Sequence, residues 1–247
     1  RLWNFVWWGG WGAVALLGAH ALYTELHGHI DVREVLIAFK FGCMTLARVI
    51  VLVTLASLVW VPVGVWIGLR PALAMRMQLV AQILAAFPAN LFFPVAVVAI
   101  LQFELNPNIW LSPLMVLGTQ WYILFNVIAG ASAFPNDLRD VATNLRVRGW
   151  QWWYRVMLPG VFPYFVTGGL TASGGSWNAS IVAELVVWGS TRLEANGLGS
   201  YIAKATLAGD YPRIILGVMV MSAFVTVFNR LVWRPLHAYA ERRLRLI

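Results

Sequence analysis

The residues that could perform covalent or metal chemistry are few and widely separated along this chain of 247 residues. Its one cysteine, Cys43, can form no intrachain disulfide and lacks the companions that a metal cluster needs. His27 and His29 are two positions apart, which is poor spacing for shared metal binding on a helix. The sequence holds no G-x-x-x-x-G-K-[ST] loop for nucleotide phosphates. We therefore expect a chain that is not an enzyme and that binds no metal, cofactor or ATP itself.

The segment richest in polar and aromatic groups runs from Asp137 to Pro159 and reads DLRDVATNLRVRGWQWWYRVMLP. It holds four arginines, two aspartates and three tryptophans. Val141, Leu145 and Trp152 fall at helical spacing, so one face can dock while the arginines stay in water. The segment predicts one or two short helices on a membrane surface. They would serve either as a connector that touches only lipid or as a handle for a soluble partner.

The composition of the whole chain predicts a protein embedded in a lipid bilayer. Hydrophobic residues make up 60% of the chain, charged residues 11%, and the mean hydropathy is +0.73. A soluble domain carries about 25% charged residues, so an ordinary soluble enzyme, a disordered region and a nucleic-acid-binding module are excluded. The long runs are apolar on every face instead of alternating, which favours helices over a membrane β-barrel.

Long gaps between charged residues mark the expected membrane spans, because a charge at the centre of a spanning helix costs about 2.5–3.5 kcal/mol. Five gaps hold between 21 and 32 uncharged residues, and about 20 apolar residues cross a bilayer. The gap from Arg213 to Arg230 leaves 16, which suffices if Arg230 snorkels and Leu231 to Trp233 continue the helix. We predict an all-α integral membrane protein with about six transmembrane helices.

Particular residues predict how these helices begin, bend and pack. Pro88 and Pro94 should kink or loosen the third helix, and Tyr211-Pro212 should open the sixth. Thr24 to Gly42 is charged, so we expect an interfacial segment outside the hydrocarbon core. The glycines that would allow close helix approach are Gly168, Gly169, Gly174 and Gly175. The expected division is residues 1–42 for a first helix and this outer segment, 43–235 for a core of five helices, and 236–247 for a basic cytoplasmic tail.

The basic residues predict the orientation. If the first helix runs from inside to outside, twelve basic residues lie inside and six outside, which places both ends in the cytoplasm under the positive-inside rule. For residues 1–23 a retained helix competes with a signal peptide, for which Ala19-His20-Ala21 would be the cleavage site. Because the chain begins with Arg1, we expect it to be part of a longer polypeptide.

The 137–159 loop resembles the cytoplasmic signature of permeases of binding-protein-dependent ABC importers. That signature is E-A-A, three residues, G, nine residues and I-x-L-P, and it falls in register on Asp140-Val141-Ala142, Arg146 and Val156-Met157-Leu158-Pro159. Arg146 stands where the family has glycine, which allows a backbone turn at little steric cost. Either Gly149 makes the turn instead, or the loop is a degenerate copy.

The resemblance extends over nearly the whole chain from Cys43 onward. The matching segments include Thr45-Leu46-Ala47-Arg48, Phe87-Pro88, Trp177, Ala183-Glu184 and Gly197-Leu198-Gly199. Within the family, this chain is similar to the branch of nitrate, sulfonate, taurine and bicarbonate permeases. Some of its members are double-length chains, and this chain resembles a second half.

The resemblance implies a type I importer bundle in a bacterial inner membrane, with a coupling helix from about Asp140 to Gly149 in a groove of a cytoplasmic ATPase. ATP-driven closure of an ATPase dimer, which carries ATP and magnesium, would draw two such helices together and swing the permease pair from inward-open to outward-open. The implied partners also include a second permease half (the same chain, an identical one or a paralogue), a periplasmic or surface-anchored solute-binding protein and membrane lipid, but no nucleic acid. The residues expected to couple are Asp140, Val141, Ala142, Leu145, Arg146, Gly149, Leu158 and Pro159.

Polar residues inside the spans predict which helices line a path for a small anionic or polar solute. The candidates are Asn90, Gln120, Asn126, Ser176, Asn178 and Glu184, the last matching a family glutamate. Hydrogen bonds between helices, each contributing about 0.6 kcal/mol, are the alternative role. No expected span carries a positive charge, so amide and hydroxyl donors, helix N-termini or the partner half would hold an anion.

Other classes of membrane protein need features that this sequence lacks or does not require. An ion-coupled secondary carrier usually places ionisable groups at the bilayer midplane, whereas here only His20 falls inside an expected span, toward its outer end. A membrane-embedded enzyme would need clustered catalytic groups, and a membrane scaffold subunit is the remaining alternative. Co-purification of an ATPase would separate a permease from a secondary carrier.

Overall fold

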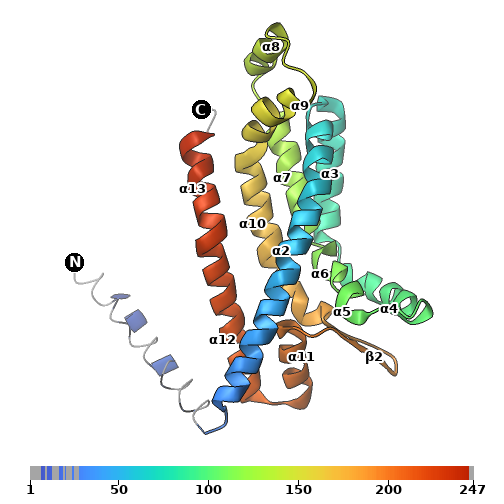
Figure 1. The fold of residues 1–247 in the computed structure, drawn as a ribbon, viewed down its shortest axis with the longest axis vertical. Coiled ribbons are helices and arrows are strands. Elements are labelled where there is room, and N and C mark those ends of the chain that lie inside the picture. Colours follow the sequence, from blue (N-terminus) through green and yellow to red (C-terminus); the bar gives the residue numbers. More distant parts are fainter. Residues whose placement is uncertain are drawn as a thin grey trace.

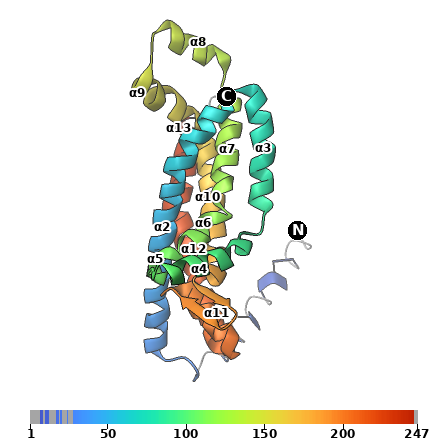
Figure 2. The same ribbon diagram turned by 90° about the vertical axis from the view of Figure 1, so that its right-hand side faces the viewer.

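The computed structural model describes residues 28–244 continuously, together with positions 7, 8, 10–12, 17, 18, 20 and 24 (Figure 1). The expected first helix, the alternative signal peptide and His27 therefore lie largely outside the described residues. Residues 28–244 form the helical bundle and the hairpin drawn in Figures 1 and 2.

Three helical runs are long and apolar enough to cross a membrane: Val32–Gly68, Gly149–Ala183 and Tyr211–Arg243. The first is the single helix α2 (Val32–Gly68). The second joins α9 (Gly149–Trp152), a π-helical turn η2 (Trp153–Met157) and α10 (Leu158–Ala183). The third joins α12 (Tyr211–Phe228), the π-helical turn η3 (Asn229–Trp233) and α13 (Arg234–Arg243). The three runs lie side by side along the long axis of the molecule (Figures 1 and 2).

Two further spans are broken. The first pair is α3 (Pro71–Ala86) with η1 (Ala89–Phe92) and α4 (Phe93–Gln102), bent by 76°. The second is α5 (Pro107–Trp110) and α6 (Pro113–Leu117) with α7 (Gln120–Ser132), bent by 42°. Counting each bent pair as one gives up to five candidate spans, in the places of the second to sixth predicted helices.

The prolines act differently from a simple kink. Phe87, before Pro88, has extended backbone angles and ends α3, because a proline disfavours the α conformation in the residue before it. Pro94 instead lies in the first turn of α4, where its missing N–H costs nothing. The third predicted helix is therefore divided and bent by 76° near Pro88, and Pro94 opens its second part instead of kinking a continuous helix.

Residues 32–42, which belong to the expected interfacial segment, form the first turns of the continuous helix α2, and their position outside the hydrocarbon core stays a prediction. Asp31 caps this helix by accepting a 2.7 Å hydrogen bond from the Val32 N–H, and Ala38 is fully buried. Tyr211-Pro212 opens α12 as predicted, and the expected tail is helical as far as Arg243. The division of the chain at residues 43 and 235 stays a prediction.

One end of the molecule carries a hairpin and a short helix that the sequence did not predict. Strands β1 (Leu185–Trp188) and β2 (Thr191–Glu194) pair antiparallel, with Trp188 opposite Thr191. Gly189 turns the chain with φ of +60°. The helix α11 (Leu198–Ala208) follows. At the opposite end lie α8 (Asn136–Asn144), α9 and the end of α13 (Figures 1 and 2).

Helix α10 is the centre of the packing, since it contacts α7, α2, α11 and α13. Gly168 lies where α10 meets α7: a Cβ there would be 2.7 Å from the Tyr122 carbonyl oxygen and 3.1 Å from the Ile123 Cα. Both are backbone atoms, so the helices would have to separate. This confirms that a glycine is needed for close approach at this position, whereas a Cβ at Gly174 would meet nothing within 4 Å.

We expect Gly168→Ala to destabilise the chain by about 1–3 kcal/mol, because added volume in a packed interior strains its surroundings. Gly174→Ala on the same helix is the matched control and should be neutral or stabilising by up to about 1 kcal/mol, since alanine favours helix over glycine. Unfolding of each purified variant in mixed detergent micelles measures both. Equal effects of the two substitutions would contradict the packing argument.

Candidate functional site

The loop predicted to couple the permease to an ATPase forms α8, a turn and α9 at one end of the bundle (Figure 2). Ala142 is the one residue of α8 that is buried. Val141 and Leu145 are exposed apolar residues, at 51% and 71%. The predicted amphipathic surface helix is therefore present over Asn136–Asn144, and part of its apolar side faces outward.

Helix α8 ends in a turn centred on Arg146. The Val147 N–H donates to the Ala142 carbonyl at 2.9 Å, and the Arg146 N–H donates to the Thr143 carbonyl at 3.0 Å. This pair of bonds is the Schellman motif, which places a left-handed residue, usually glycine, just after the helix. Arg146 has φ of +53°, so the arginine itself makes the turn at the family's glycine position. Gly149 also has positive φ, +60°, and starts α9.

A hollow of about 280 Å³ lies behind α8, between that helix, the start of α10 and the end of α13. Val147 and Ala142, the two ends of the Schellman bond, both line it. The other lining residues are Phe134, Leu138, Val141, Leu145, Arg155, Val156, Pro159, Gly160, Arg243 and Leu244. The structure thus brings together four of the predicted coupling residues: Val141, Ala142, Leu145 and Pro159. Asp140, Arg146, Gly149 and Leu158 are not among its lining residues.

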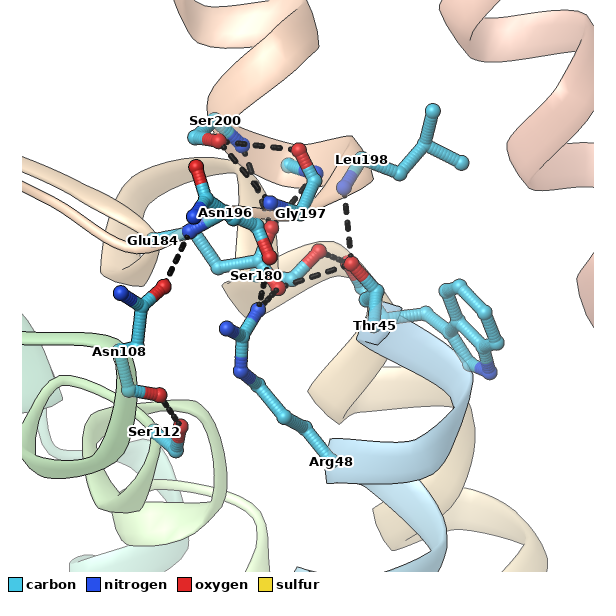
Figure 3. Close-up of polar contacts among 12 residues, drawn as sticks. Thr45, Arg48, Asn108, Ser112, Ser180, Glu184, Asn196, Gly197, Leu198 and Ser200 are labelled. Carbon is cyan, nitrogen blue, oxygen red and sulfur yellow. Dashed lines mark hydrogen bonds and ion pairs between the residues drawn. The ribbon is translucent and has the colours of Figure 1, made fainter. Parts of the chain in front are cut away.

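At the opposite end, Glu184 is the hub of a buried polar cluster (Figure 3). Its side chain is 1% exposed and forms an ion pair with Arg48, whose Nη1 lies 2.9 Å from the Glu184 Oε1. The Thr45 hydroxyl donates to the same oxygen at 2.8 Å. The Gly199 and Ser200 N–H groups at the start of α11 donate to Oε2 at 2.8 and 3.2 Å. A carboxylate at a helix N-terminus is electrostatically favourable.

The cluster joins segments that are far apart in the chain. The Leu198 N–H donates to the Thr45 Oγ1 at 2.9 Å, and Arg48 donates to the Asn196 carbonyl at 2.8 Å. The Asn196 N–H in turn donates to the Asn108 side chain at 2.8 Å. Glu184 therefore belongs to the junction of α2, α10 and α11 in this structure. The chain's own donors surround and bury its carboxylate, and its expected role in the solute path stays a prediction.

A second polar group lies at the hairpin end of the bundle. The Tyr201 hydroxyl donates to the Glu34 Oε1 at 3.0 Å, and Arg213 pairs with the same carboxylate at 2.9 Å. Burial, together with the hydrogen bond to Glu34, raises the pKa of the Tyr201 hydroxyl above its usual value. Tyr201 therefore stays protonated as a donor that ties α11 to α2.

The largest hollow described here, about 640 Å³, lies between η1, α6, α10, the hairpin and α11. Its lining is mostly apolar, and its polar side chains are those of Asn90, Thr119 and Thr206. Of the residues predicted to line a path, Asn90 is in this lining. The predicted Ser176 is fully buried and hydrogen-bonds Thr119 at 3.0 Å, directly behind the wall.

The remaining path candidates have three different environments. One forms a hydrogen bond between helices, one forms a hydrogen bond within its own helix, and one is exposed. Gln120 accepts a 3.0 Å hydrogen bond from the Trp60 Nε1, which links α7 to α2. Asn126 donates to the Tyr122 carbonyl of its own helix at 2.7 Å. Asn178 is exposed on α10. The structure therefore does not gather the six candidates into one cavity.

The described residues hold no group of three or more histidine, cysteine, aspartate or glutamate side chains that could bind a metal ion. What the chain offers is a helical bundle with an exposed helical loop at one end and a rigid polar junction at the other. This architecture defines a multi-pass helical membrane protein whose outward-facing parts suit other subunits.

Comparison with known proteins identifies the family. The family described as "Binding-protein-dependent transport system inner membrane component" matches residues 60–246. The chain is 29% identical over 233 residues to the bicarbonate transport system permease protein CmpB of Synechococcus elongatus, covering 90% of this chain and 79% of that protein. It is 26% identical over 188 residues to the nitrate import permease protein NrtB of Leptolyngbya laminosa, covering 76% and 64%.

The chain belongs to this family of inner-membrane components of binding-protein-dependent transport systems. It is the multi-pass permease component of an ABC importer and a non-catalytic transport subunit, as the sequence predicted. The family binds no cofactor and leaves ATP hydrolysis to a separate ATPase subunit. A binding protein and an ATPase are the partners that such a system implies.

We expect Arg146→Gly to strengthen the turn after α8, because a left-handed residue with a Cβ costs about 1 kcal/mol more than glycine. Arg146→Ala is the control, since it removes the guanidinium and keeps the Cβ. Hydrogen exchange of the Val147 amide should be about fivefold slower in the glycine variant than in the alanine variant. Equal exchange in both would show that the turn is not strained.

We expect Glu184→Gln to destabilise the chain by about 3 kcal/mol or more, because the amide has one oxygen for four donors and leaves Arg48 without its partner charge. Glu241→Gln, at a carboxylate that is 61% exposed, should change stability by less than about 0.5 kcal/mol. Unfolding in mixed micelles measures both. In a double-mutant cycle with Arg48→Gln, strictly additive losses would contradict a direct pair.

Proposed function

We propose that this chain forms half of the translocation path for a small oxyanion such as bicarbonate or nitrate, and that a cytoplasmic ATPase drives it by binding α8. The observation that carries the proposal is the exposed apolar surface of α8, where Val141 and Leu145 stay accessible at the edge of the hollow that the buried Ala142 also lines. Exposed apolar residues on a short surface helix are typical of a protein interaction site. The family membership supports an ATPase as the partner.

The packing behind α8 gives a route for force. Ala142 on α8 and Pro159 on α10 line the same small hollow, and η2 and α10 continue directly from α9. A displacement of α8 by the ATPase would therefore act on the base of α10, the helix around which the bundle packs. In this proposal Val141 and Leu145 contact the ATPase with Asp140 and Arg146 beside them, and Ala142, Gly149, Leu158 and Pro159 hold the helix in place.

The solute proposal rests on the chemistry of the large hollow and on the relatives. Its polar lining consists of the amide of Asn90 and the hydroxyls of Thr119 and Thr206. Such neutral donors can bind a small oxyanion weakly enough to release it again. The relatives are named as permeases for bicarbonate and nitrate. We propose Asn90 as the first residue of this chain to test for solute contact.

The proposed arrangement places α8, α13 and both chain ends on the cytoplasmic side, in line with twelve basic residues there against six outside. The β1–β2 hairpin and α11 would then face the periplasm and the solute-binding protein. A second permease half, identical, paralogous or fused, would complete the path.

We expect Leu145→Glu to reduce the amount of ATPase subunit that co-purifies with the permease by roughly tenfold, since a charge would replace an apolar contact at the centre of the interface. The chain itself should fold normally, because the Leu145 side chain is 71% exposed. ATP-dependent uptake of labelled bicarbonate or nitrate into vesicles should fall in parallel.

Trp188→Glu is the matched control, because Trp188 is exposed to 56% and lies on the hairpin at the other end. It should leave ATPase retention unchanged. Retention of the ATPase by Leu145→Glu would refute the coupling role of α8. If wild-type vesicles retain the ATPase but accumulate neither anion, the proposed solute would be refuted and the coupling role of α8 would not.

A further inference from the structure

We infer that a second hollow beside α8 binds a phosphate group, supplied by the headgroup of an anionic phospholipid. This hollow, of about 450 Å³, is lined by Val65, Trp66, Leu69, Arg70, Arg139, Trp152 and Trp153. It lies between the end of α2, helix α8 and the α9–η2 segment. It shares no lining residue with the hollow behind α8.

Two guanidinium groups give this hollow its charge. Arg70 follows α2 and Arg139 lies on α8, and neither forms an ion pair with any residue from 28 to 244. The Arg70 guanidinium is held in place, since it lies 4.3 Å from the centre of the Trp66 ring and one nitrogen donates to the Trp66 carbonyl. None of its other donors bonds to a residue between 28 and 244. Two such groups facing one space suit a phosphate, which arginine binds with paired N–H donors.

The aromatic residues indicate that the phosphate belongs to a lipid. Trp66, Trp152 and Trp153 line the same hollow as the arginines, and Trp152 and Trp153 pack edge to face with ring centres 6.0 Å apart. Tryptophan is enriched at the headgroup level of membranes. The site also lies where the long apolar helix α2 ends, at Gly68. Basic pockets beside the ends of membrane helices are typical sites for anionic lipid headgroups.

The start of α3 adds a partial positive charge next to Arg70. Arg70 is the N-cap residue of α3, Pro71 follows it, and no side chain caps this helix. Unpaired N–H groups at a helix start favour a nearby anion. A bound phosphate would therefore bridge the α2–α3 turn and α8 through Arg70 and Arg139. Anionic lipid would in this way hold the helix that the ATPase is proposed to bind, on a face separate from the coupling residues.

The test measures lipid binding by the purified full chain. Native mass spectrometry would follow retention of phosphatidylglycerol and of phosphatidylcholine by the wild type and by Arg70→Gln, Arg139→Gln and Arg148→Gln. We expect wild-type preference for phosphatidylglycerol and a loss of about fivefold in its affinity for each of the first two variants. Arg148, exposed and outside the lining, is the matched control and should change the affinity less than twofold.

Further arms separate the sources of the phosphate. Failure of millimolar inorganic phosphate to displace phosphatidylglycerol supports the lipid, whereas displacement would keep the phosphate site and overturn its assignment to a lipid. Arg70→Lys keeps the charge and should lose less affinity than Arg70→Gln, which guards against a folding defect in the glutamine variant. Equal binding of the two lipids, or an equal loss in Arg148→Gln, would overturn the site. Loss of the ATPase from Arg139→Gln with lipid binding unchanged would assign that arginine to the ATPase instead.

Discussion

The structure depends on one buried negative charge being matched by donors from two other segments of the chain. Glu184 ends α10, Thr45 and Arg48 belong to α2, and the Gly199 and Ser200 N–H groups start α11. Taking a carboxylate out of water costs several kcal/mol unless its partners are all present. The three segments therefore meet in one geometry or leave a buried charge unmatched. This constraint makes the hairpin end of the bundle its rigid end.

Helix α10 connects that end with the 137–159 loop, which we propose binds the ATPase. Its first residues line the hollow behind α8, and its last residue precedes Glu184. Between them Gly168 lets α10 approach the backbone of α7 closely, so the helix is also held along its length. A force applied at α8 would meet a close-packed helix, and close-packed interiors transmit displacement instead of absorbing it.

Much of the helical fold could be predicted from charge spacing, because the cost of charge in a bilayer acts on each residue locally. The composition of the 137–159 segment marked it as a surface loop, and the resemblance to the family signature showed the departure at Arg146. Local reasoning could not predict the hairpin, because Leu185 to Trp188 is an apolar run that reads as more helix. It also missed the partners of Glu184: Thr45 and Arg48 lie 139 and 136 positions away, and no periodicity reports a contact over that separation.

Glycine is preferred at the left-handed position after a helix because it has the lowest energy there, not because other residues cannot adopt it. The turn at Arg146 is an example. The two Schellman hydrogen bonds form with arginine in the left-handed conformation, so the geometry does not require glycine. The penalty of about 1 kcal/mol is of the same size as the net contribution of about 1 kcal/mol from a typical hydrogen bond, so the two bonds of the turn can offset it. Hydrogen bonds can therefore hold this turn without glycine, and glycine only lowers the cost of reaching it. A departure from a family signature at such a position is therefore compatible with the family's fold.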